Sequence, residues 1–190
     1  MRIGIFGGSF DPPHIAHLRL CEEAMENLKL DKILFIPVNI PPHKQKVYSS
    51  ALHRLNMTKL SVKGNRNFVV SDIDIRRGGV SYTVDTLMEL REKGKEMFLI
   101  IGEDMLNQFD KWKDYQKIYE MVKIAVLRRE GGEKTQEKEK KIDIEYIKIN
   151  NPLLNISSTM IRDLVKKNKS IRYLVTDKVE EYIKRHFLYK

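Results

Sequence analysis

The chain has little cysteine, which limits how it can be held together. Cys21 is the single cysteine among 190 residues, so no disulfide can form within the chain. A chain without disulfides is typical of a reducing compartment, and we expect a cytoplasmic protein. Cys21 falls in a helical pattern, where a small buried hydrophobic residue is more common than a reactive thiol.

Long hydrophobic runs are also absent. No apolar stretch approaches the roughly 20 residues that span a bilayer, and the N-terminus has no signal-peptide core. The sequence contains neither an internal repeat nor a linker rich in Pro, Gly or Ser. We therefore expect no membrane association and a single domain over residues 1–190, which is long enough to bury a core.

Two common phosphate-binding patterns are missing. The turn after the first apolar run reads Gly4-Ile5-Phe6-Gly7-Gly8, which is not the Gly-x-Gly-x-x-Gly of dinucleotide cofactors. A Walker phosphate loop is absent as well. The sequence therefore predicts a mononucleotide or phosphate site of another design.

The charges favour anionic partners. Lysine and arginine number 35 against 26 acidic residues, a net charge of +9, which attracts small phosphates or nucleic acid. The alternative is a lysine-rich surface that serves solubility. The basic residues are dispersed, and no helix-turn-helix, zinc-finger or stacked-aromatic motif occurs, so we expect no nucleic-acid partner. Residues 130–141 mix both signs and predict a mobile loop.

Short apolar runs alternate with helical patterns, which predicts an α/β protein with a doubly wound, mostly parallel sheet and helices on both faces. Strands are expected at Arg2–Phe6, Ile33–Val38, Phe68–Val70, Phe98–Gly102, Ile124–Leu127 and Ile144–Lys148. Helices are expected at Ala16–Leu28, Ala51–Val62, Val84–Lys93, Asp110–Met121, Ser158–Lys166 and Asp177–His186. Ligands bind such sheets at the carboxyl ends of strands, so the segments after Phe6 and Gly102 are candidates.

The segment from Gly7 to His17 contains the most informative residues. Gly7 and Gly8 allow a ligand to approach the backbone closely. His14 and His17 fall on one face of the first turn of a helix, whose unpaired N–H groups and dipole favour an anion. Metal ligation by the two histidines lacks further ligands at suitable spacing, and ordinary core or surface histidines are the other alternative.

Two separated segments resemble signatures of the nucleotidyltransferase superfamily. Gly8-Ser9-Phe10-Asp11-Pro12-Pro13-His14-Ile15-Ala16-His17 resembles its [T/H]-x-G-H signature, with Ala16 where the family usually has glycine. Ile156-Ser157-Ser158-Thr159-Met160-Ile161-Arg162 resembles its I-S-S-T-x-I-R signature. The resemblance implies a Rossmann-like nucleotidyltransferase fold.

Three further segments resemble the bacterial nicotinate-nucleotide adenylyltransferases. They are the loop Ile36–Lys44, with Pro-Pro-His-Lys at its end, the segment Ser81–Leu87, and Gly102-Glu103-Asp104 followed by Trp112. The resemblance covers nearly the whole chain. It implies transfer of AMP from ATP to nicotinate mononucleotide, which gives deamido-NAD and pyrophosphate. It also implies Mg²⁺ bound with the ATP phosphates.

The resemblance assigns the site residues as follows. It implies catalytic roles for His14, His17 and Arg162. It implies ATP binding by Gly7, Gly8, Ser9, Phe10, His14, His17, Gly102, Asp104, Ile156, Ser157, Ser158 and Arg162. It implies nicotinate-mononucleotide binding by Ser9, Lys44, Tyr82, Thr83 and Trp112.

Each of these segments also has a plainer structural interpretation. Ser157 or Ser158 can simply cap a helix, Asp104 can cap a short helix at 104–108, and a lone tryptophan usually belongs to the core. The loop at Pro41–Lys44 can be an ordinary surface loop.

Rival functions remain open at this stage. One is another transferase of the superfamily, for example one that acts on phosphopantetheine. The others are a nucleic-acid-binding module and a catalytically silent nucleotide sensor. The sequence does not decide the oligomeric state, and a homo-oligomer is compatible with it.

Overall fold

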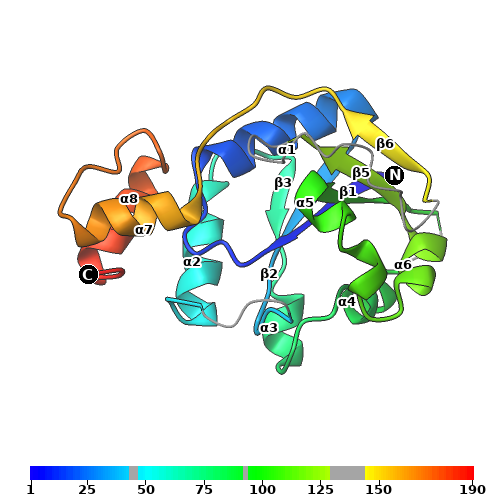
Figure 1. The fold of residues 1–190 in the computed structure, drawn as a ribbon, viewed down its shortest axis with the longest axis horizontal. Helices are drawn as coiled ribbons and strands as arrows, with labels where there is room; N and C mark the ends of the chain where they lie inside the picture. Colours follow the sequence, from blue (N-terminus) through cyan, green and yellow to red (C-terminus); the bar gives the residue numbers. More distant parts are fainter. Residues whose placement is uncertain (43–46, 92–93, 129–143) are drawn as a thin grey trace.

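A six-stranded sheet forms the centre of the computed structural model, which describes residues 1–42, 47–91, 94–128 and 144–190 (Figure 1). All neighbouring strands pair in parallel, in the order β3-β2-β1-β4-β5-β6. The strands are β1 Arg2–Gly8, β2 Lys32–Pro37, β3 Phe68–Val70, β4 Glu96–Gly102, β5 Lys123–Leu127 and β6 Tyr146–Ile149. The strand order reverses between β1 and β4, and sheets of this kind bind ligands beside such a reversal.

The inner strands are apolar along most of their length, as expected where both faces of a sheet are covered. In β4, Phe98 and Ile100 pack into a cluster with α1 (Ile15–Leu28), which lies against one face. Leu99 and Ile101 point the opposite way and pack with α4 (Thr83–Leu90) and α6 (Tyr115–Met121). Successive residues of a strand alternate between faces, so one strand contributes to two cores.

The remaining helices complete these layers and add a small third core. They are α2 Ala51–Ser61, α3 Ile73–Arg77, α5 Glu103–Leu106, α7 Ser158–Lys166 and α8 Asp177–Arg185, with a 3₁₀ turn at Phe109–Lys111. Helix α3 covers the same face as α4. Helices α7 and α8 pack beside α2 at one side of the sheet, where the C-terminus also lies (Figure 1).

The predicted fold class is confirmed, and the predicted strands and helices agree with the structure to within one to three residues at most ends. The predicted helix Asp110–Met121 is wrong in its first half: the chain forms the 3₁₀ turn, becomes extended at Trp112 and reaches a φ of 50° at Asp114 before α6 begins. Trp112, Tyr115, Ile118 and Met121 are spaced three residues apart and pack into one cluster, which resembles a helical period across the break. The break leaves Trp112 outside regular structure.

Helix α3 was not predicted, whereas α5 corresponds to the short helix that the sequence allowed at 104–108. That helix begins one residue earlier than expected, so its N-cap is Gly102 and not Asp104. Helix α3 ends at Gly78, where φ is 75°, and glycine after a helix is a recognisable stop signal. Asp104 lies in the first turn of α5. Short helices of this length have too few residues to show a clear period.

Three other sequence-based expectations have mixed outcomes. Cys21 is fully buried, and burial raises the pKa of its thiol well above the ordinary value, so it packs as a hydrophobic residue. In the part of the chain that the structure describes, no helix has the length and apolar character that a membrane crossing needs. The loop predicted to be mobile, residues 130–141, lies outside the described residues.

Candidate active site

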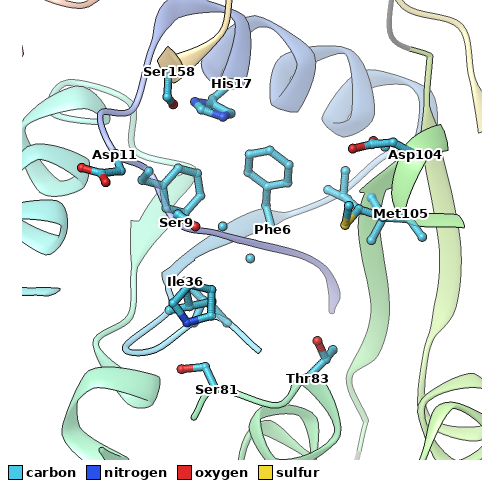
Figure 2. Close-up of a pocket in the computed structure, with 18 of the residues that line it drawn as sticks. Phe6, Ser9, Asp11, His17, Ile36, Ser81, Thr83, Asp104, Met105 and Ser158 are labelled. Atoms are coloured by element: carbon cyan, nitrogen blue, oxygen red, sulfur yellow. The ribbon is translucent and has the colours of Figure 1, made fainter. Parts of the chain in front are cut away.

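A pocket of about 790 Å³ opens at the carboxyl ends of β1 and β4, beside the reversal of strand order. Figure 2 shows His17 and Ser158 on one side of this pocket and Ser81 and Thr83 on the opposite side, with Phe6 between them. The pocket therefore has two ends built from different parts of the chain. Its position agrees with the general rule for open parallel sheets.

Nearly all residues that the sequence analysis singled out line this one pocket. Lys44 is the exception, because it lies outside the described residues. The pocket lining includes Gly7, Gly8, Ser9, Phe10, His14, His17, Tyr82, Thr83, Gly102, Asp104, Trp112, Ile156, Ser157, Ser158 and Arg162. Tertiary folding thus brings together segments from both ends of the sequence.

The two glycines at the end of β1 serve different needs. A Cβ at Gly8 would lie 3.1 Å from the Phe10 ring, which packs against Phe6 at 5.7 Å between centroids. Phe10 itself has a φ of 48°, an uncommon conformation for an aromatic residue. A Cβ at Gly7 would meet nothing within 4 Å. Gly8 therefore allows the turn to pack, whereas Gly7 leaves pocket space open.

His14 and His17 cap the N-terminus of α1. The His14 backbone N–H donates to Nδ1 of His17 at 3.1 Å, and the two rings stack with centroids 3.6 Å apart. This arrangement is a capping box in which the histidine at the third helical position takes the place of the usual glutamate. Because Nδ1 accepts this bond, the neutral His17 ring carries its proton on Nε2.

The first turn of α7 is fastened to the loop between β1 and α1. Ser157 caps α7 by accepting the Met160 N–H at 3.1 Å. The Ser158 hydroxyl donates to the Pro12 carbonyl at 2.8 Å, and Arg162 donates to the Asp11 carbonyl at 2.7 Å. The two segments that resembled superfamily signatures are therefore in direct contact. They form one wall that carries hydroxyl and guanidinium donors.

Sequence reasoning missed Arg54, which supports the same loop from beneath. Its side chain is fully buried in α2 and donates to the carbonyls of Ser9 at 3.0 Å and Val38 at 2.6 Å. Burial lowers the pKa of Arg54, and the nearby Asp11 charge opposes that shift. A lone arginine in a helical pattern normally indicates a solvated face, so the sequence contains no signal for this role.

The opposite side of the pocket is built around the start of α4. Tyr82 is the N-cap residue and its side chain makes no capping hydrogen bond. Ser81 is buried and accepts the Asn39 N–H at 2.8 Å, so it holds the loop that follows β2. Trp112 packs against Phe109 with ring centroids 5.3 Å apart and also lines the pocket. The tryptophan therefore combines a core contact with an exposed face.

The pocket carries few metal ligands. Among residues 1–42, 47–91, 94–128 and 144–190, no three His, Cys, Asp or Glu side chains are grouped so that they could hold a metal ion. The carboxylates that line the pocket are those of Asp11, Asp74 and Asp104. Asp11 accepts three hydrogen bonds and Asp74 pairs with Arg77, so a divalent ion here would be held mainly by a bound anion and water.

Known proteins resemble the chain over its full length. A family model described as cytidylyltransferase-like matches residues 5–164. A probable nicotinate-nucleotide adenylyltransferase of Exiguobacterium sibiricum is 39% identical over 191 residues, covering 100% of this chain and 99% of that protein. A second probable nicotinate-nucleotide adenylyltransferase, from a Geobacter species, is 40% identical over 100% of this chain and 98% of its own length.

Solved structures show the same fold. The Plasmodium falciparum nicotinic acid mononucleotide adenylyltransferase complexed with NaAD has a TM-score of 0.75 at 22% identity, over 99% of this chain and 97% of that chain. The fold, the pocket that joins both signature segments and the relatives of equal length lead to one assignment. The chain belongs to the nicotinate-nucleotide adenylyltransferases, within the cytidylyltransferase-like family.

Proposed function

We propose that the chain transfers the adenylyl group of ATP to nicotinate mononucleotide and releases pyrophosphate. The observation that carries this proposal is the meeting of the two signature segments: Ser158 and Arg162 of α7 bond to the loop that leads into His14 and His17. Hydroxyl, imidazole and guanidinium groups thereby line one wall of a pocket. Such a wall suits a triphosphate.

Bringing the two substrates together is an electrostatic problem. Two unit charges about 4 Å apart repel by roughly 4 kcal/mol at an effective dielectric of 20, and several such pairs arise between ATP and a mononucleotide. Arg162 is placed to offset this charge, because it is nine-tenths buried and its planar guanidinium presents several N–H donors. His14, His17, Ser157 and Ser158 add donors along the same wall.

The chemistry needs no general base. A phosphate monoester has a second pKa of about 6, so the mononucleotide is mostly a dianion at neutral pH. One of its phosphate oxygens attacks the α-phosphorus of ATP, and the bond from that phosphorus to the bridging oxygen breaks as pyrophosphate leaves. Alignment of the two reactants alone can contribute up to about 7–11 kcal/mol.

The remaining roles follow the two ends of the pocket. Gly7, Gly8, Ser9 and Phe10 form the turn beneath the ATP phosphates, and Asp104 with Gly102 and Ile156 contacts the nucleoside. Mg²⁺ accompanies the phosphates and neutralises part of their charge. At the other end, the free amides at Tyr82 and Thr83 receive the nicotinate carboxylate, while Trp112 stacks on the pyridine ring. Lys44 adds a cation for the mononucleotide phosphate.

The test is pyrophosphate release from ATP and Mg²⁺ with three acceptors in parallel: nicotinate mononucleotide, nicotinamide mononucleotide and phosphopantetheine. A carboxylate suits the amides at the start of α4 better than a carboxamide does, so we expect the acid acceptor to have the highest kcat/KM, by about ten-fold or more. Equal kcat/KM for acid and amide would refute the role of Tyr82 and Thr83. Activity with phosphopantetheine alone would refute the proposed substrate.

A further inference from the structure

The C-terminal end of the chain returns to the loop between β1 and α1. After α8 ends at Arg185, Phe187 and Tyr189 adopt φ angles of 52° and 65°. This left-handed conformation is unfavourable for aromatic residues. Its result is that Phe187 stays 71% exposed, whereas Tyr189 is only 8% exposed and packs with Met57 of α2 and the cluster of α7 and α8. The penultimate residue is thus held inside the protein.

The Tyr189 hydroxyl is hydrogen-bonded to a buried carboxylate. The hydroxyl donates to Oδ1 of Asp11 at 2.7 Å, and Asp11 is only 3% exposed. The Ser49 hydroxyl donates to the same oxygen at 2.6 Å, and the Tyr48 N–H donates to Oδ2 at 2.6 Å. Burial and the Asp11 charge raise the pKa of Tyr189 far above its usual value, so its hydroxyl remains a donor throughout the neutral range.

Asp11 connects this network to the wall that carries Arg162. The Arg162 guanidinium donates to the Asp11 carbonyl at 2.7 Å and lies over the Tyr48 ring, 4.1 Å from its centroid. The Tyr48 backbone is in turn held by the Asp11 carboxylate. One ring of contacts therefore runs from Tyr189 through Asp11 and Tyr48 to Arg162. Arg162 also acts on Tyr189 through its charge.

The Asp11 carboxylate also presents an electrostatic problem to the pocket. Asp11 lines the cavity in which the proposed function seats a triphosphate, and an unrestrained carboxylate there would repel it. Three hydrogen-bond donors fix the Asp11 carboxylate in one orientation and compensate its charge. Tyr189 supplies one of these three donors, although it is far from Asp11 in sequence.

We propose that Tyr189 is a positioning residue for the ATP site, whose hydroxyl acts through Asp11 to fix the loop between β1 and α1 and the Arg162 guanidinium. The proposal rests on the proposed function for its kinetic readout. Tyr189 is absent from the pocket lining, so its effect is on ATP affinity through the loop. The turn that follows α8 thereby contributes to the ATP site.

The experiment compares Tyr189→Phe with Tyr182→Phe in the full-length protein. Tyr182 of α8 is the matched control, because its hydroxyl also bonds across to α2, to His53 at 3.0 Å and Asn56 at 3.2 Å, but not to the loop. We expect Tyr189→Phe to raise the KM for ATP by about ten-fold while the KM for nicotinate mononucleotide changes by less than about two-fold. Tyr182→Phe is expected to leave both KM values within about two-fold.

A binding measurement keeps the test independent of turnover. Titration of a non-hydrolysable ATP analogue with Mg²⁺ should show about ten-fold weaker binding for Tyr189→Phe alone, even if the wild-type protein proves inactive on nicotinate mononucleotide. An inactive wild type would refute the proposed function, whereas equal analogue affinity for the wild type and Tyr189→Phe would refute the positioning role. Equal losses in both tyrosine variants would also refute it.

A double-mutant cycle decides whether the effect passes through Asp11. Its Asp11→Asn variant keeps Tyr189 and tests the route even if Tyr189→Phe folds poorly, because an unchanged analogue affinity in folded Asp11→Asn would overturn it. If Tyr189 acts through Asp11, Asp11→Asn combined with Tyr189→Phe should weaken analogue binding no more than Asp11→Asn alone. Additive losses would overturn the proposed route. Thermal unfolding of each variant shows which comparisons concern folded protein.

Discussion

The His17 imidazole caps α1 with one nitrogen, and the residue also lines the pocket. Its Nδ1 accepts the His14 N–H, and its face and edge contact His14 and Phe10. A histidine held this rigidly presents its remaining nitrogen in one direction. The sequence showed that two histidines share one turn, but not that one caps the other.

Replacement of His17 by alanine should separate these two roles. Loss of the cap is expected to lower the free energy of unfolding by about 1 kcal/mol, whereas loss of a transition-state donor is expected to lower kcat by about 100-fold or more. Steady-state kinetics and urea unfolding of the same preparation measure both. His53→Ala in α2, outside the pocket lining, serves as the control with unchanged kcat. An unchanged kcat in His17→Ala would exclude it from the mechanism.

Helix α7 illustrates what a secondary-structure element adds beyond its residues. Its N-cap, Ser157, and the donors Ser158 and Arg162 lie at the start of the helix. Capping the helix therefore also sets the position of the pocket wall that we propose binds the triphosphate. By contrast, the first half of the predicted helix 110–121 is replaced by a 3₁₀ turn and a residue at positive φ. Local turns of this kind depend on tertiary packing around Trp112, which periodicity does not report.

Two N-cap serines allow this element to be tested. Ser157 accepts the Met160 N–H and Ser50 of α2 accepts the His53 N–H, at 3.1 and 3.2 Å. Each serine-to-alanine variant should lose about 1 kcal/mol of stability. Of these two variants, only Ser157→Ala should also raise the KM for ATP, by several-fold, because Ser157 lines the pocket and Ser50 does not. Thermal melts and ATP titrations check both points, and an equal rise in KM for Ser50→Ala would contradict the assignment.

The molecule taken as a whole carries a net charge of +9, from basic residues that are dispersed along the sequence. A basic protein attracts anionic substrates from a distance, and salt screens that attraction with a Debye length of about 10 Å at 0.1 M. The charge therefore favours capture of ATP and mononucleotide, independently of the contacts inside the pocket.

Raising the ionic strength should therefore weaken capture more than turnover. We expect kcat/KM for ATP to fall by about three- to ten-fold between roughly 0.05 and 0.5 M salt, while kcat changes less than about two-fold. Initial-rate measurements over a salt series provide the test, with circular dichroism at each salt concentration to verify folding. A kcat/KM independent of salt would show that the surface charge contributes nothing to substrate capture.

Local sequence patterns are enough to specify the parallel α/β architecture, because apolar runs such as Leu99–Ile101 encode doubly covered strands and the glycines after Phe6 encode an open turn. The sequence also determined which segments form the pocket, since both signatures contain their donors within a few residues. The hydrogen bonds that hold the pocket loop in place, by contrast, follow only from the three-dimensional fold. Arg54, Asp11 and Tyr189 act through hydrogen bonds between residues distant in sequence, and no local pattern specifies such partners.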